Sequence, residues 1–175
     1  MNKENLMSTY YKMCVVIAMG AFLSLFLYLK QFPKGMNGDI TKTFFSLKFN
    51  VMPNETVEVF NSIIIVFFVI FLINLGVFVF TLVGTKVKGL LAEGAFYNMI
   101  LSFLLLLSQL AYHLQIPKIV NGEISHSIFH SNFYRLTDVR IIVFNFSYLF
   151  ITIYMFYNIY IIYKMIPKKS SQKEN

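Results

Sequence analysis

Residues 63–83, IIIVFFVIFLINLGVFVFTLV, decide the fold because they are almost entirely hydrocarbon. Only Asn74, Gly76 and Thr81 interrupt the run, which is long enough to cross a bilayer core of about 30 Å. A short basic turn, residues 84–89 (GTKVKG), follows, and a second long apolar run comes directly after it. Two adjacent spans joined by such a turn form an antiparallel pair, with the turn predicted in the cytosol.

The composition is typical of a membrane protein. Hydrophobic residues make up 57% of the 175 and charged residues 13%, which is about half the charge of a typical soluble domain. The formal charge of +7 does not indicate nucleic acid as a partner, because no run of five basic residues occurs. The lysines lie near span ends instead, where they face lipid headgroups. A single cysteine excludes an intrachain disulfide.

Two further apolar runs complete the predicted architecture. The first follows a polar N-terminal segment and ends in KQFP without a small-x-small cleavage site, so it is predicted to be an uncleaved span rather than a signal peptide. We therefore predict an all-α membrane protein, a four-helix bundle in which residues 1–175 form a single domain. The predicted spans are 13–29, 60–83, 90–114 and 141–163, and the outer loops are 30–58 and 115–140.

The distribution of basic residues predicts that both termini are cytosolic. Segments 1–12, 84–89 and 164–175 hold eight Lys or Arg in 30 residues, whereas the two outer loops hold seven in 55. Cytosolic segments of membrane proteins carry the excess of basic residues.

The first outer loop carries two local signals. Residues 43–51 (TFFSLKFNV) have the aromatic and β-branched content of a short strand, although their alternation is imperfect. Asn54 opens the triplet NET, which is a glycosylation acceptor if the loop is lumenal. Such triplets also arise by chance, and the sequence leaves both readings open.

Polar residues on the third and second spans are expected to bond between helices. On the third span they fall within about 100° of one another, and a polar stripe on a spanning helix faces protein rather than lipid. Interhelical hydrogen bonding is favoured over a transport path. Asn74 on the second span is expected to bond to another helix. The predicted stripe consists of Gly94, Asn98, Ser102, Gln109 and His113.

Other candidate residues are few. Cys14 lies near the inner membrane edge and is predicted either to be S-acylated or simply to pack. His126 and His130, four residues apart, lack a carboxylate or cysteine at ligand spacing and make a weak metal proposal. Tyr154, with three later tyrosines of the last span, is expected near the inner interface. No catalytic residue, cofactor site or metal site is predicted, and an enzyme is not expected.

The layout resembles the claudin and peripheral-myelin-protein superfamily of four-span proteins. Both ends lie inside, the first outer loop is the larger, and the inner turn is tight. Several strings look like its sperm-associated branch, the transmembrane protein 225 type. These strings are 71–75 (FLINL), 80–81 (FT), 100–103 (ILSF), then Lys118, Gly122 and His126, and 134–137 (YRLT).

The resemblance implies a non-enzymatic protein, either an accessory or scaffold subunit of a membrane complex or an adhesion protein, in the plasma membrane of sperm. Unlike claudins, the chain has no Trp and no cysteine in its first outer loop, so it does not fit a junction-sealing role. The branch also implies regulation of protein phosphatase 1, but the motif-like string 140–144 (RIIVF) is at the outer face. A small-molecule or ion carrier subunit is the remaining alternative. Expected partners are the bilayer and other membrane proteins; the oligomeric state is left open.

Overall fold

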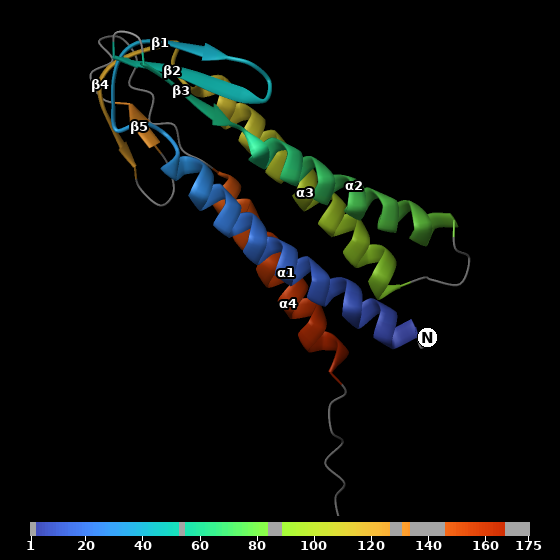
Figure 1. Cartoon of the computed structure of the whole chain (residues 1–175). Coiled ribbons are helices and arrows are strands. Elements are labelled where there is room, and N and C mark those ends of the chain that lie inside the picture. Colours follow the sequence, from blue (N-terminus) through green and yellow to red (C-terminus); the bar gives the residue numbers. More distant parts are fainter. Residues whose placement is uncertain (1–2, 53–54, 84–88, 127–130, 134–145, 167–175) are drawn as a thin grey trace, which may run out of the picture.

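The computed structural model describes residues 3–52, 55–83, 89–126, 131–133 and 146–166. These residues form four helices and a five-stranded sheet at one end of them (Figure 1). In chain order the elements are α1 (Lys3–Lys30), β1 (Gly35–Lys42), β2 (Ser46–Met52), β3 (Glu55–Phe60), α2 (Ser62–Val83), α3 (Leu90–Gln115), β4 (Ile119–His126), β5 (Ser131–Phe133) and α4 (Ser147–Met165).

The four helices lie in two pairs. Figure 1 shows α1 beside α4 and α2 beside α3 along most of their lengths. Edge-to-face rings of Phe22 and Tyr148, with centroids 4.9 Å apart, join the first pair. In the second pair the centroids of Phe71 and Phe103 are 5.5 Å apart. The pairing brings the first and last helices of the chain together.

Three of the described helices are long and apolar enough to cross a membrane. These stretches are Leu6–Lys30, Ser62–Val83 and Leu90–Gln115, with 25, 22 and 26 residues. They coincide with three predicted spans, although α1 begins ten residues before the predicted start at Met13. Large apolar side chains remain exposed along all three helices, as expected for surfaces that contact lipid. The chain is therefore that of a helical membrane protein.

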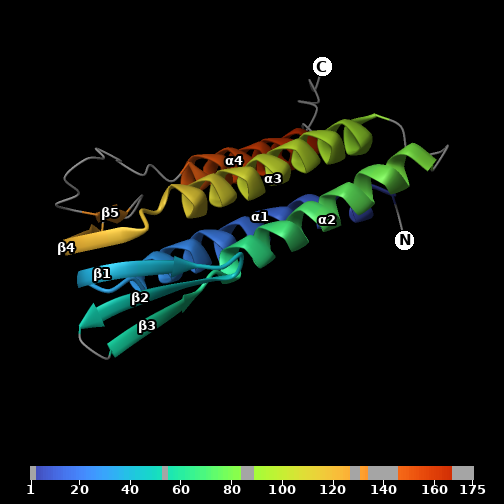
Figure 2. The same cartoon turned by 90° about the horizontal axis from the view of Figure 1, so that it is seen from above.

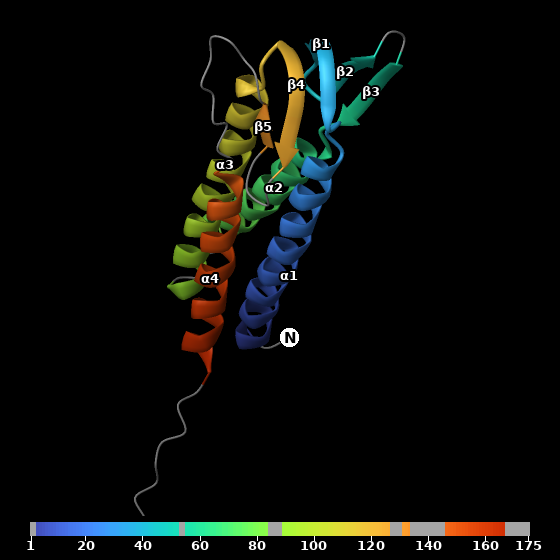
Figure 3. The ribbon, with the colours of Figure 1, turned by 90° about the vertical axis from the view of Figure 1, so that its left-hand side faces the viewer.

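The sheet corrects the all-α prediction. Instead of one short strand at residues 43–51, the two loop regions together supply five antiparallel strands in the order β3-β2-β1-β4-β5. Figure 3 shows the sheet at one end of the helices, and Figure 2 shows β1, β2 and β3 beyond the ends of α1 and α2. Strand β1 lies at the centre and pairs with β2 from its own loop and β4 from the other.

Alternation along the strands gives the sheet one apolar and one polar face. Side chains at every second position are buried against the helix ends, and the ring of Phe49 lies 5.3 Å from that of Phe32, just beyond α1. Intervening positions are exposed and mostly polar. The buried face consists of Met36, Ile40, Leu47, Phe49, Val59, Val120 and Ile124.

Candidate functional site

A network of amide and phenol groups joins all four helices in the interior of the bundle. Its centre is a reciprocal pair between α3 and α4, in which Asn98 Nδ2 donates to Asn158 Oδ1 at 2.8 Å and Asn158 Nδ2 donates to Asn98 Oδ1 at 2.9 Å. Both residues are fully buried. Asn158 Nδ2 also donates to the carbonyl of Tyr154, one turn earlier in α4, at 2.7 Å. Each amide therefore fixes the orientation of the other.

Helices α1 and α2 join this pair through tyrosine hydroxyls. Asn98 Nδ2 donates to the Tyr10 hydroxyl at 3.2 Å, and Tyr10 in turn donates to Asn74 Oδ1 at 2.7 Å. Asn74 Nδ2 donates to the Tyr154 hydroxyl at 3.1 Å. The interhelical bond expected of Asn74 is thus present. We call Tyr10, Asn74, Asn98, Tyr154 and Asn158 the amide network.

The structure places Cys14 beside the network and not at the lipid surface. Its side chain is 2% exposed, and its sulfur lies 3.7 Å from Asn98 Nδ2. An acyl chain attached there would have to fit inside the closed bundle. Cys14 therefore packs in the interior of the bundle, and its S-acylation stays a prediction.

All five residues of the predicted stripe on α3 are buried, but they have different partners. Gly94 packs directly against the ring of Tyr11. The Tyr11 hydroxyl donates to the carbonyl of Leu90 at 3.0 Å. Ser102 bonds within its own helix, to the carbonyl of Met99 at 2.9 Å. The stripe therefore combines a close helix contact, an intrahelical bond and, in Asn98, the centre of the amide network.

The outer part of the stripe connects α3 to the last helix and to the sheet. Gln109 Oε1 accepts a bond from Ser147 at 3.3 Å, while its Nε2 has no hydrogen-bond partner among the described residues. His113 Nδ1 lies 3.1 Å from Asn61 Nδ2, and His113 Nε2 lies 2.8 Å from the Thr43 carbonyl. Because a carbonyl can only accept, His113 donates from Nε2 and accepts at Nδ1, as a neutral imidazole.

Lys42, at the end of β1, binds the C-terminal end of α3. Its ammonium group donates to the Leu114 carbonyl at 3.2 Å and to the Ile116 carbonyl. Burial lowers the pKa of Lys42, and the nearby charge of Lys118 lowers it further. A cation at a helix C-terminus complements both the unpaired carbonyls and the helix dipole. These bonds attach the sheet to α3 at a second point, in addition to the bond between His113 and the Thr43 carbonyl.

The outer face of the sheet is a polar surface. Cross-strand neighbours on it include Asn37 with Asn121 and Lys48 with Glu58, the latter at 3.7 Å as an exposed ion pair. We define this outer face by its exposed polar residues. They are Asn37, Asp39, Thr41, Lys48, Asn50, Thr56, Glu58, Asn121, Glu123 and Ser125.

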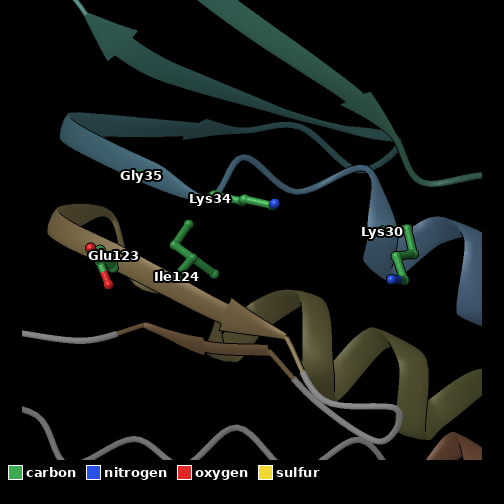
Figure 4. Close-up of a pocket in the computed structure, with 5 residues that line it drawn as sticks. All are labelled: Lys30, Lys34, Gly35, Glu123 and Ile124. Atoms are coloured by element: carbon green, nitrogen blue, oxygen red, sulfur yellow. The ribbon is translucent and has the colours of Figure 1, made fainter.

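A pocket of about 540 Å³ lies where α1 meets the sheet. Figure 4 shows Lys30 and Glu123 at its opposite ends, with Lys34 and Ile124 between them. Two of its lining residues are joined by a hydrogen bond from the backbone amide of Ile124 to the carbonyl of Lys34 at 2.7 Å. Charges of both signs at the end of a candidate span are typical of a surface facing lipid headgroups.

Several predicted positions cannot be compared with the structure. Asn54 and His130 lie outside the described residues, and only the backbone of His126, at the end of β4, is described. Within the described part of the chain, no group of three or more His, Cys, Asp and Glu side chains is placed to hold a metal ion.

Sequence reasoning missed part of the amide network. Tyr154 was expected near the inner interface, but it is buried and bonds to Asn74. Asn158 follows it by one turn, so the pair marks an interior face of α4 that the apolar pattern alone does not reveal. Tyr10 lies ahead of the predicted first span, and for that reason it was not considered.

No family model matches this chain, and neither a curated protein nor a solved structure matches it. The resemblance drawn from the sequence strings therefore stays a prediction.

Proposed function

We propose that the protein is a non-enzymatic four-span scaffold that presents its outer sheet to other membrane proteins, as an accessory subunit or an adhesion protein. The observation that carries this proposal is the amide network. It uses the polar groups at the centre of the helices for bonds within the chain. The surface left for recognition of a polar partner is then the outer face of the sheet.

The position of α4 supports a fourth span. With 19 residues it is about 28 Å long, enough to cross most of a hydrocarbon core. It packs beside α1, which is a candidate span, along most of its length (Figure 1). Its five tyrosines and Asn158 bring polar groups into a segment that would lie in hydrocarbon, where unpaired polar groups are costly. Tyr154 and Asn158 direct their polar groups into the bundle, which offsets that cost.

The proposed orientation has both termini in the cytosol and the sheet outside. It rests on the denser Lys and Arg residues of the inner segments. A plasma-membrane location, in sperm, is supported by the sequence strings similar to the transmembrane protein 225 type. In that setting the sheet would meet partners of the same membrane or of an opposing one.

A carrier function has less support. Transport paths through helical bundles are usually lined by ionisable residues or broken helices. In this bundle Asn98 and Asn158 bond directly to each other. Asn74 is linked to them through the hydroxyls of Tyr10 and Tyr154, and all these hydrogen bonds are 2.7 to 3.2 Å long. These bonds would have to open for a solute to pass.

The test is purification from native membranes in mild detergent, with identification of the chains that co-purify. The change Asn37→Arg together with Thr41→Arg on the outer face should lower partner recovery without lowering thermal stability. The matched control is Val69→Leu on the exposed side of α2, which should leave recovery unchanged. Unchanged recovery with the outer-face variant would contradict the proposal. Capture of the phosphatase by a peptide of residues 164–175 would favour the regulator instead.

A further inference from the structure

Exposed apolar side chains in the sheet region are confined to its border with the helices. Among the described residues outside the helices and their ends, the exposed large apolar side chains of this region are Phe44, Phe45, Phe60 and Ile119, at 59%, 46%, 53% and 53% exposure. Phe60 precedes α2 by two residues, and Ile119 follows α3 by four. The remaining outward positions are polar, so the apolar residues form a band and are not scattered.

The turn between β1 and β2, which carries Phe44 and Phe45, is held in place from both sides. Within it, the Thr43 hydroxyl accepts a bond from the Ser46 amide at 2.9 Å and lies 2.9 Å from the Ser46 hydroxyl. The Asn61 amide, next to α2, donates to the Phe45 carbonyl at 2.6 Å. His113 of α3 donates to the Thr43 carbonyl at 2.8 Å. The turn is therefore fixed at the ends of two candidate spans.

The two rings at this turn form a rigid apolar unit. Their centroids are 4.8 Å apart with an interplanar angle of 81°, an edge-to-face arrangement. The first exposed apolar side chains of α2, Ile65 and Phe68, follow within two turns of the bond to Asn61. The turn is thus bonded to the chain next to the point where the exposed apolar surface of α2 begins.

We propose that the turn inserts Phe44 and Phe45 into the lipid leaflet next to the sheet, so that the sheet rests on the membrane and is not held away from it. Lipid is the occupant that the geometry favours, because the bonds to Asn61 and His113 hold the turn level with the ends of two candidate spans. Exposed apolar patches at such borders mark membrane contact, and aromatic rings are stable at interface depth. This inference needs only the α2 and α3 spans and does not depend on the proposed partner binding.

The absence of tryptophan from the sequence permits a direct test. Phe44→Trp and Phe45→Trp each introduce one fluorophore into the full chain, which is then placed in phosphatidylcholine nanodiscs. Lipids brominated near the headgroup end of the acyl chain should quench much of this emission, and aqueous iodide should quench little. Lys48→Trp on the outer face should give the opposite pattern, and Val69→Trp in α2 should be quenched by deeply brominated lipid.

Two outcomes would overturn the proposal. If the emission of the Phe44→Trp and Phe45→Trp variants is quenched by iodide as strongly as that of Lys48→Trp, the turn lies in water. If the emission is protected from iodide but insensitive to brominated lipid, protein covers the turn, as a second copy of this chain would. Thermal unfolding of each variant checks that it is folded, so that quenching reports on the native turn.

Discussion

At the scale of single residues, Gly94 determines how closely α1 approaches α3. A Cβ atom at this position would overlap the Tyr11 hydroxyl and lie 2.7 Å from Tyr11 Cζ. Because Tyr11 is fully buried, its ring cannot move aside freely. Gly94→Ala should therefore destabilise the bundle by about 1–3 kcal/mol, the usual cost of overpacking, and lower the midpoint of thermal unfolding in detergent.

A matched glycine and a second-site change make this prediction specific. Gly20→Ala on α1 meets nothing within 4 Å and should leave the midpoint unchanged or raise it, because alanine is the better helix former. Tyr11→Leu removes the ring, so adding it to Gly94→Ala should cost less than the sum of the two single changes. Additive losses would show that Gly94 and Tyr11 are not in contact.

Asn98 and Gln109 lie on the same stripe of α3, yet their replacement should have different effects. Asn98→Leu breaks the reciprocal pair and leaves Asn158 Oδ1 without its donor, which costs about 1–3 kcal/mol for a buried group. Gln109→Leu loses one bond of 3.3 Å and removes an Nε2 group that lacks a partner among the described residues. We expect a clear fall in the unfolding midpoint for Asn98→Leu and little change for Gln109→Leu. Equal losses would contradict the bonding described for the two residues.

At the scale of elements, Lys42 connects a strand to the end of a helix. Lys42→Met would leave the Leu114 and Ile116 carbonyls without this donor and remove a cation worth about 0.3–1 kcal/mol at a helix C-terminus. Backbone amides in the last turn of α3 should then exchange hydrogen faster. The control is Lys48→Met, because Lys48 lies on the outer face in an exposed ion pair with Glu58. Equal exchange in both variants would exclude the connecting role.

The titration of Lys42 gives this contact a pH dependence of known sign. Burial lowers its pKa in the folded chain below the ordinary lysine value of 10.5. Between the two pKa values the unfolded chain binds more protons, so the stability contributed by this group rises with pH in that window. Stability curves of the native chain and the Lys42→Met variant, measured up to that range, should show the rise in the native chain only. A rise of the same size in the variant would assign it to another group.

The helices could be predicted from the sequence far better than the strands. Long apolar runs specify spans directly, and the stripe on α3 identified Asn98 from its spacing alone. The strands are polar on alternate positions, rich in Asn and Gly in β1 and β4, and none exceeds eight residues. Their pairing across two loops is nonlocal, which a local pattern does not contain. Tyr10 was missed because it precedes the predicted first span, and Asn158 because the apolar pattern of the last span does not show which of its faces is interior.

At the scale of the whole molecule, the proposed orientation places residues 30–58 and the sheet on the side away from the cytosol. Asn54 lies in this region, outside the described residues, and its triplet should then be accessible to the glycosylation machinery. Glycosidase treatment of the protein from mammalian cells should increase its gel mobility, and Asn54→Gln should abolish that shift. Protease protection that places residues 30–58 in the cytosol would contradict the orientation.

Because α4 is the last helix of the chain, the interior bonds of the bundle are completed only when its synthesis ends. The ribosome delivers α4 last, so the nascent chain has to hold Asn98, Tyr10 and Asn74 in or near the bilayer before Asn158 and Tyr154 arrive. An amide without a partner in hydrocarbon is costly. A chain that stops before residue 147 would leave Asn98 Oδ1 without its donor, Asn158 Nδ2, and should therefore be less stable than the full chain, even though three of its helices are complete.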